Sequence, residues 1–172
     1  VLALTALLAA LLATLALRQW RGTRRMRALA MTDELTDAPN RRAVLARLDA
    51  QLALPGARCS VALLDVDHFK SINDQHGHPA GDEVLRTIAA HLRAQVTEPA
   101  FFGRLGGEEF LVVLPGADTA AALAAGERLR EAIRGLEMSQ WFADGRGITA
   151  SLGVATQRDG AETSTTLLQR AD

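Results

Sequence analysis

Two short acidic segments carry the residue types that metal-assisted phosphate chemistry requires. Asp65 and Asp67 follow the apolar run 60–64, whereas Glu108 and Glu109 follow two consecutive glycines. Strand alternation places Asp65 and Asp67 on one face of a strand. Like charges brought close together need a cation, and Mg²⁺ binds one or two carboxylates together with substrate phosphates. Two such ions can hold the attacking and leaving oxygens of a phosphoryl transfer.

Each acidic segment also has a plainer explanation. An Asp-x-Asp pair after a strand can simply be exposed, and RLGGEEF, residues 104–110, also fits a solvated acidic β-turn. The glycines Gly106 and Gly107 nevertheless make a tight turn whose backbone a bulky ligand can approach. We therefore expect a metal-dependent phosphate site in which Glu108 lies beside Asp65 on the neighbouring strand.

A polar segment, residues 67–83, lies between the two acidic segments and is predicted to be a loop. It contains Lys70, Asn73 and Asp82. An Asn and an Asp together can pair with a guanine edge, and Lys70 can place its charge on a phosphate. Asp82 could instead cap the helix that Gly81 is expected to open. The histidines of this segment have no cysteine beside them and fit no zinc-site spacing.

The elements expected to position these residues alternate between helices and short strands. Helical periodicity or strand-like apolar runs cover most of the chain after residue 39, and the strands around the glycine pair form a hairpin. The predicted helices are residues 40–54, 81–96 and 118–136 with a last one from residue 163, and the predicted strands are residues 60–64, 101–105, 109–114 and 147–156. This order predicts an α+β domain on a mixed or antiparallel sheet.

Charge separates the first 32 residues from the rest of the chain. They hold five arginines and no acidic residue, which leaves 14 basic and 20 acidic residues in the remainder. A net-acidic domain is a poor nucleic-acid binder, so no nucleic-acid partner is expected. The single cysteine, Cys59, precludes a disulfide within the chain, fits a reducing compartment and is expected in the core.

The first 17 residues are uncharged and strongly apolar, which predicts a transmembrane helix over residues 1–20. A span needs about 17–25 residues, and Trp20 suits the membrane interface. The arginines follow the apolar run, which disfavours a signal peptide and places the rest of the chain on the cytoplasmic side. A buried helix is the other alternative. The domain is thus expected to face the cytoplasm from the inner membrane.

Residues 21–34 are predicted to form a helical linker between the span and the domain. Met26, Leu29 and Ala30 share one stripe at helical spacing, which suits pairing with a second copy. A solvated tether is the alternative. The chain begins at Val1 rather than Met, so the span is expected to be the last one of a longer protein.

Four ordered motifs resemble the GGDEF family of diguanylate cyclases, in its GGEEF variant. They are LTDAPNRR (35–42), LLDVDHFKSINDQHGHPAGDEVL (63–85), RLGGEEF (104–110) and SLGVA (151–155). The resemblance implies a palm-like βααββαβ sheet flanked by helices, in a catalytic domain over residues 35–172. It implies condensation of two GTP into cyclic di-GMP by a homodimer with one GTP per protomer. A silent GTP-binding or signal-relay member of the family is the alternative.

The resemblance also implies roles in catalysis for individual residues. Asp65, the main-chain carbonyl of Val66, Glu108 and Glu109 would bind metal, expected to be two Mg²⁺ or Mn²⁺ ions per site. Glu108 would also act as the base for the 3′-hydroxyl, and Lys70 would stabilise phosphate charge.

A second group of residues is implied to bind the nucleotide. Asn73 and Asp82 would bind the guanine base, and His78 would touch the nucleotide. Gly106 and Gly107 would let it approach the turn.

The chain departs from the family pattern in three places. Ala38 stands where Leu is usual, which is expected to loosen the wall near the base. The family's inhibitory product motif, R-x-x-D, is replaced by Thr97–Ala100. The family's phosphate-contacting Lys and Arg would follow Asp172, so the catalytic domain is expected to be truncated there.

Overall fold

The computed structural model describes residues 31–56, 58–138, 142, 147–158 and 162–172. By its internal contacts the chain divides into two units, Val1–Met31 and Thr32–Asp172, and the fold below is that of the second unit. The predicted span over residues 1–20 and most of the predicted linker lie outside the described residues. Within the described ranges, no helix combines the length and the apolar character needed to cross a membrane.

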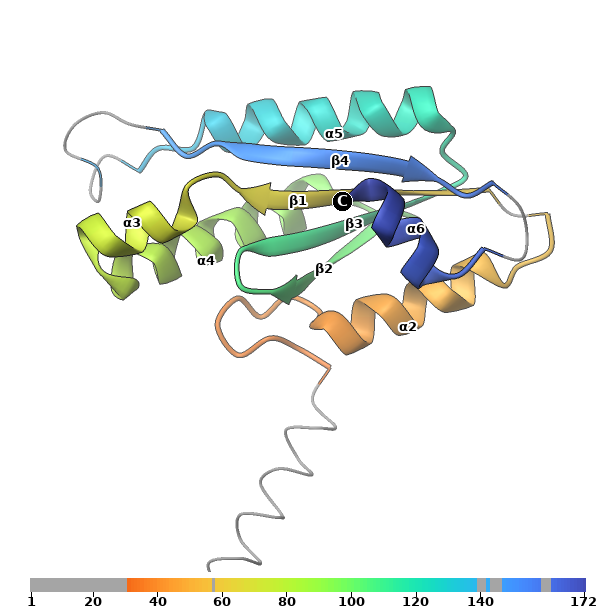
Figure 1. Ribbon diagram of the computed structural model, residues 1–172, viewed down its shortest axis with the longest axis horizontal. Coiled ribbons are helices and arrows are strands. Elements are labelled where there is room, and N and C mark those ends of the chain that lie inside the picture. The colour runs from red at the N-terminus through yellow and green to blue at the C-terminus, as the bar shows by residue number, and fades with distance from the viewer. Residues whose placement is uncertain (1–30, 57, 139–141, 143–146, 159–161) are drawn as a thin grey trace, which may run out of the picture. The chain divides into compact units, whose positions relative to one another are not determined.

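The sheet has four strands in the order β2-β3-β1-β4, and every neighbouring pair is antiparallel (Figure 1). The strands are β1 (Cys59–Val66), β2 (Phe101–Gly106), β3 (Glu109–Pro115) and β4 (Ala150–Thr156). Because β1 is an inner strand, its side chains are covered on both faces, which explains its continuous apolar run. The predicted α+β class and the hairpin around the glycine pair are confirmed, and of the two predicted sheet types, mixed and antiparallel, the structure has the antiparallel one.

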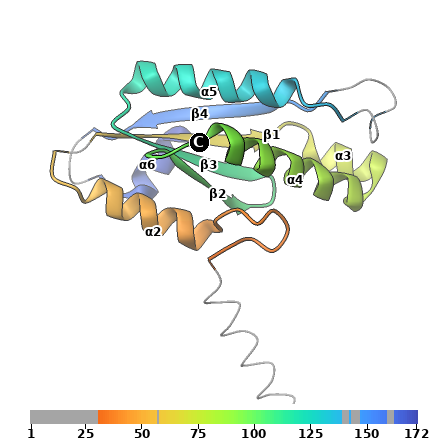
Figure 2. The same cartoon turned by 180° about the vertical axis from the view of Figure 1, so that it is seen from behind.

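Helices cover both faces of this sheet (Figures 1 and 2). They are α2 (Arg41–Leu52), α3 (Phe69–His76), α4 (His78–Gln95), α5 (Thr119–Arg134) and α6 (Ser164–Ala171). Helices α4 and α5 pack on one face around Leu64 and Phe110, whereas α2 and α6 pack on the other around Leu111. The order of strands and helices from β1 to β4 is the βααββαβ order that the family resemblance implied.

Side-chain caps mark the starts of three helices at the predicted residues. The side chains of Asn40, Asp118 and Thr163 each accept a hydrogen bond from the backbone N–H three residues later, at 3.1, 2.8 and 3.3 Å. Such caps satisfy N–H groups that have no partner within the helix.

The segment 67–83 is not the loop that its polar composition predicted. It forms α3 and the first turn of α4, separated by Gly77 at a φ of +81°. Helix α3 is only eight residues long, and its two apolar residues, Phe69 and Ile72, are partly buried against the core, which is too short a pattern to reveal a helix in the sequence. Helix α4 begins at His78 rather than at Gly81, with Pro79 in its first turn, where proline is favourable.

The described end of the predicted linker is also not helical. Thr32 forms an isolated bridge with Pro39, and the N–H of Asp33 donates to the carbonyl of Ala38 at 2.8 Å. These contacts close a loop over residues 32–40, which leads directly into α2.

Cys59 is fully buried at the start of β1, as predicted. Burial raises the pKa of its thiol to about 11. The side chain therefore stays protonated at neutral pH and serves as a small core residue.

Candidate active site

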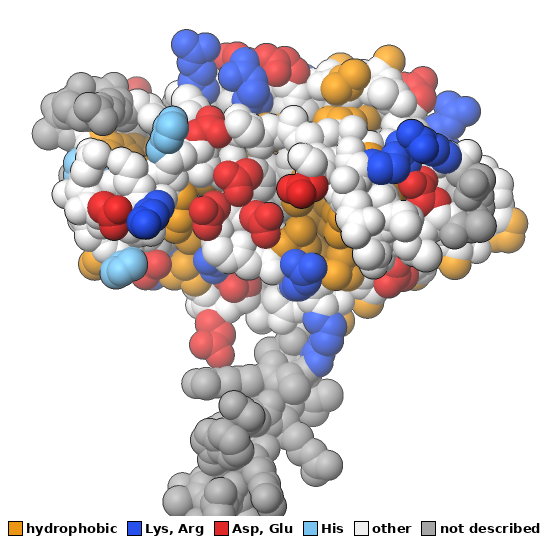
Figure 3. All heavy atoms as spheres, viewed as in Figure 1, with side chains coloured by type: hydrophobic (Ala, Val, Ile, Leu, Met, Phe, Trp, Pro, Cys, Tyr) orange, Lys and Arg blue, Asp and Glu red, His pale blue; other side chains and the backbone are white. Residues whose placement is uncertain are grey.

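Acidic side chains gather where β1 ends beside the β2–β3 turn. In Figure 3 they occupy the surface between α3 and the end of α6, above that turn. Asp65 of β1 is in register with Glu109 of β3 and with Ser151 of β4. Glu108, which was predicted to lie directly beside Asp65, is instead in the turn itself, because the hairpin register brings Glu109 opposite Asp65.

The carboxylates of this group act on one another. Burial raises the pKa of Asp65, and the negative charges of Glu108 and Glu109 raise it further, ahead of smaller effects from Asp67 and Asp172. This burial is only partial, because Asp65 still exposes much of its surface to solvent, whereas Glu108 and Glu109 are half-buried. The repulsion disfavours ionisation of Asp65, and a bound cation would relieve it.

The donor atoms at this point suit Mg²⁺ or Mn²⁺, because carboxylate and carbonyl oxygens are the ligands that these ions prefer. Considering only the residues that the structure describes, no three His, Cys, Asp or Glu side chains are close enough together to hold one ion. Mg²⁺ in nucleotide enzymes commonly binds one or two carboxylates and completes its shell with phosphates and water. The residues therefore fit a cation that binds together with a nucleotide.

Asp67 differs from Asp65 although both were predicted to face the same way. Its carboxylate accepts a hydrogen bond from the Ser151 hydroxyl at 2.7 Å, and its N–H donates to the Thr149 carbonyl at 3.0 Å. Partial burial opposes ionisation of Asp67, but hydrogen bonds to its carboxylate from the side chains of Ser151 and Thr149 outweigh this effect and lower its pKa. Asp67 thus ties the end of β1 to β4.

The glycine pair makes an open turn. Gly106 and Gly107 have φ values of +145° and +51°, which L-residues with side chains rarely adopt. Apart from the adjacent residues of the chain, no described atom lies within 4 Å of the position that a Cβ would take at either glycine. The turn therefore leaves free space directly before Glu108, as the approach of a ligand to the backbone requires.

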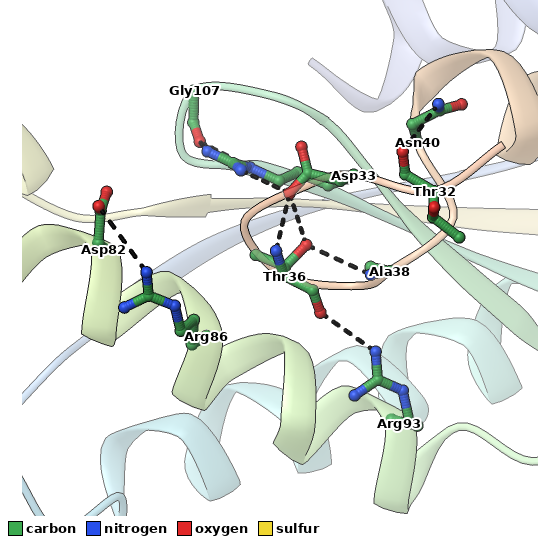
Figure 4. Close-up of polar contacts among 10 residues, drawn as sticks. Thr32, Asp33, Thr36, Ala38, Asn40, Asp82, Arg86, Arg93 and Gly107 are labelled. Carbon is green, nitrogen blue, oxygen red and sulfur yellow. Dashed lines mark hydrogen bonds and ion pairs between the residues drawn. The ribbon is translucent and has the colours of Figure 1, made fainter. Parts of the chain in front are cut away.

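Two residues predicted to bind guanine lie close together on neighbouring helices. Asn73 of α3 lies over Gly81 of α4, since a Cβ at Gly81 would be 2.1 Å from the Asn73 Oδ1 atom. Asp82 is the next residue and is in the second turn of α4, so it is not a capping residue. Its carboxylate is 47% exposed and lies 4.0 Å from the guanidinium of Arg86 (Figure 4). The pair is thus presented at the surface.

Of the remaining predicted ligands, Val66 is the last residue of β1 and its side chain is buried, whereas Lys70 and His78 are exposed. Lys70 is in the first turn of α3, and His78 is the first residue of α4. His76, two residues before His78, instead packs edge-on against the Phe142 ring at 5.0 Å between ring centroids. Lys70 and His78 are therefore available to a ligand, whereas His76 has a packing role.

Sequence analysis assigned no role to Arg104 or Asp33, which the structure joins across the glycine turn. The two side chains form an ion pair at 2.7 Å, and Arg104 also donates to the Gly107 carbonyl (Figure 4). The only signal in the sequence is that Arg104 precedes the glycine pair at close range. Its partner, Asp33, is 71 residues away along the chain.

The structure also shows where the departures from the family pattern lie. Thr97 and Ala100 line a hollow of about 220 Å³ between α4 and α5, whose one charged lining residue is Arg128. Ala38 is fully buried in the core under α4. The effect of Ala38 on base binding stays a prediction.

Comparison with known proteins agrees with this arrangement. Residues 30–172 match the family model described as "Diguanylate cyclase, GGDEF domain". The chain is 42% identical over 146 residues to diguanylate cyclase DgcP of Pseudomonas aeruginosa, covering 83% of this chain and 22% of DgcP. It is 41% identical over 150 residues to the response regulator PleD of Caulobacter vibrioides, covering 84% of this chain and 33% of PleD. The chain thus spans a third or less of these relatives.

A solved structure shows the same fold. The GGDEF domain of DgcB from Caulobacter crescentus, in complex with c-di-GMP, superposes with a TM-score of 0.77 at 33% identity. The match covers 83% of this chain and 86% of that one, and it supports the palm-like α+β assignment. The family model covers the sheet, the β2–β3 turn and helices α3 and α4, and the two relatives are 41–42% identical, so the chain belongs to the diguanylate cyclase GGDEF-domain family.

Proposed function

We propose that the domain over residues 35–172 is a diguanylate cyclase that condenses two GTP molecules into cyclic di-GMP. The observation that carries the proposal is the group of carboxylates at the end of β1, placed beside an open glycine turn. In each half-reaction the 3′-hydroxyl oxygen of one GTP bonds to the α-phosphorus of the other. The bond from that phosphorus to pyrophosphate breaks, so two pyrophosphates leave for each cyclic product.

The acidic group is proposed to serve this reaction in two ways. Asp65, the carbonyl of Val66, Glu108 and Glu109 hold two Mg²⁺ or Mn²⁺ ions together with the GTP triphosphate. When bound, the ions would neutralise the negative charge of the phosphates. A carboxylate oxygen of Glu108 accepts the proton of the attacking 3′-hydroxyl. Lys70 places its positive charge on the phosphates.

Selection of guanine is assigned to α3 and α4. The amide of Asn73 can donate and accept, and the carboxylate of Asp82 accepts from the guanine N–H groups. His78 and the turn glycines, Gly106 and Gly107, contact the rest of the nucleotide. An adenine base would leave these polar groups without partners, which favours GTP over ATP.

The reaction is proposed to need a homodimer, because each domain provides one group of carboxylates at the β2–β3 turn and one proposed base-binding pair, Asn73 and Asp82. Two such half-sites must face each other for one GTP to attack the other. Specific activity should therefore rise with protein concentration until dimerisation is complete.

Residues 1–20 are proposed to anchor the protein in the inner membrane, with the domain on the cytoplasmic side where GTP is available. The support is the uncharged apolar run followed by five arginines. Cell fractionation of the complete natural protein, with and without these residues, tests this. Recovery of both forms in the soluble fraction would contradict the anchor.

The proposed function is tested by incubating the complete natural protein with GTP and Mg²⁺ and analysing the products by mass spectrometry. We expect cyclic di-GMP and two pyrophosphates for each molecule of it, and no cyclic product from ATP. GTP binding without turnover, under conditions where the protein is dimeric, would contradict the proposal and favour a silent GTP-binding or relay module.

A further inference from the structure

The loop over residues 32–40 is joined to the edge strand β2 rather than lying free. The N–H of Arg104 donates to the Pro39 carbonyl at 2.8 Å, and Asn40 forms a parallel bridge with Arg104. The contact is close, since a Cβ at Gly103 would lie 2.6 Å from the Pro39 carbonyl oxygen. The loop is therefore fixed on the strand that leads into the glycine turn.

Asp33 is the centre of the polar contacts of this loop. Its Oδ1 atom accepts hydrogen bonds from the Thr36 N–H at 3.0 Å, from the Thr36 hydroxyl at 2.8 Å and from Arg104 Nη1 at 2.7 Å. The side chains of Arg104 and Asp33 are only 12% and 25% exposed. Loss of either partner of such a largely buried ion pair is destabilising, because the remaining charge is left poorly solvated.

Arg104 uses its other N–H groups on the turn. Its Nε and Nη2 atoms donate to the Gly107 carbonyl at 3.1 and 2.7 Å. That carbonyl and the N–H of Glu108 belong to one planar peptide group. Arg104 thus fixes the orientation of the peptide from which Glu108 projects, at a turn where the glycine backbone is otherwise permissive.

We infer that Asp33 and Arg104 are positioning residues for Glu108, with Asp33 holding the guanidinium and the guanidinium holding the Gly107 carbonyl. Figure 4 shows the contacts in sequence, from the 32–40 loop to the turn. The inference rests on the proposed role of Glu108 as base. It predicts that the loop affects the chemical step more than it affects GTP binding, because neither side chain belongs to the proposed GTP-binding group.

The test compares Asp33→Asn with wild type in the complete natural protein, by steady-state kinetics with GTP and Mg²⁺. Asparagine keeps the size of the side chain but removes the charge that holds Arg104. We expect kcat to fall about tenfold or more, because small misplacements of a catalytic group are costly, with KM within about twofold. Glu98→Gln is the matched control, since it breaks the ion pair with Arg47 at 2.8 Å, which makes no contact with the turn.

A second comparison separates positioning from general destabilisation. Because Asp33 acts through Glu108, adding Asp33→Asn to Glu108→Gln should change the residual rate less than about twofold. An unchanged kcat in Asp33→Asn, an equal loss in Glu98→Gln, or a full additional loss in the double variant would each overturn the inference.

A readout without turnover keeps the inference separate from the proposed function. Asp33→Asn should speed hydrogen–deuterium exchange in the peptide containing residues 104–110, whereas Glu98→Gln should not. If the wild type makes no cyclic di-GMP, the proposed function fails, and this exchange decides the inference alone. Unchanged exchange in Asp33→Asn would overturn it.

Discussion

The β2–β3 turn, together with Asp65 beside it, and the Thr97–Ala100 segment differ in whether their acidic side chains are paired with a cation. At the turn, partial burial and the negative charges of Glu108 and Glu109 raise the pKa of Asp65. At the other segment, the one acidic residue, Glu98, is neutralised by two contacts from Arg47 at 2.8 and 2.9 Å. Charge that the fold leaves unneutralised is available to a ligand, whereas charge paired within the fold is not. The difference marks the turn as the place for chemistry.

The largest expected effect is at the turn. Glu108→Gln should reduce turnover by at least about 100-fold, because it removes the proposed base and a metal-binding carboxylate with little change in packing. Glu98→Gln should leave turnover within about twofold. Rates are compared at equal folding, checked by circular dichroism. Turnover of Glu108→Gln within about threefold of wild type would remove Glu108 from the mechanism.

A smaller effect is expected on the choice of base. Asp82→Ala should lower the preference for GTP over ATP by about tenfold or more, because a guanine N–H group loses its acceptor. Glu83→Ala is the matched control, as Glu83 is the next residue and pairs with the same Arg86 at 3.3 Å. The measurement is kcat/KM for each nucleotide. Unchanged selectivity in Asp82→Ala would show that the base binds elsewhere.

The Asp33–Arg104 pair should contribute to stability in a pH-dependent way. Partial burial tends to raise the pKa of Asp33, but hydrogen bonds from Arg104 and Thr36 and the charge of Arg104 lower it overall. A lowered folded-state pKa stabilises the fold above the unfolded value, about 3.9, and the contribution disappears as pH falls through the lowered pKa. Asp33→Asn should therefore lower Tm at pH 7 by a few degrees, and the difference should shrink below about pH 4.

The same Tm measurement on Glu98→Gln provides the control. The exposed Arg47–Glu98 pair, at 49% and 75% exposure, should contribute little to Tm. A Tm difference for Asp33→Asn that stays constant from pH 7 to pH 3 would show that the charge of Asp33 is not what stabilises the loop.

The smallest expected effect is on product inhibition. Micromolar cyclic di-GMP should leave the steady-state rate within about twofold, because Thr97 and Ala100 replace an arginine and an aspartate. Loss of one bidentate, charge-assisted contact costs about 2 kcal/mol, or roughly thirtyfold in affinity. Pyrophosphate release follows the rate. Strong noncompetitive inhibition that persists in Glu98→Ala would reveal a product site, with Arg128 as its first candidate.

The sequence predicted those parts of the fold whose signals are local. Apolar runs and the glycine pair located β1 and the β2–β3 hairpin, and Asn40, Asp118 and Thr163 located helix starts. Helix α3 was missed because it is short and only Phe69 and Ile72 form its apolar side. The start of α4 was placed three residues late because Gly81 was expected to open the helix, whereas Gly77 is the residue that separates α3 from α4.

The sequence predicted the site residues that belong to a recognisable motif. It did not predict the contacts that folding makes between residues far apart in the chain. The residues Asp65, Glu108 and Glu109 were identified as a group from the sequence, but which glutamate lies opposite Asp65 depends on the hairpin register. The link between Asp33 and Arg104 joins residues 71 positions apart, and only the packing of the loop on β2 brings them together. No periodicity or spacing rule would reveal that contact.

The carboxylates at the end of β1 are proposed to hold a divalent cation together with GTP. The most direct measurement is Mn²⁺ binding, followed by electron paramagnetic resonance in the presence of a nonhydrolysable GTP analogue. We expect Asp65→Asn to weaken Mn²⁺ binding at least about tenfold, since it removes one charged oxygen ligand, whereas Glu98→Gln should match the wild type. Equal Mn²⁺ binding by all three proteins would contradict the claim.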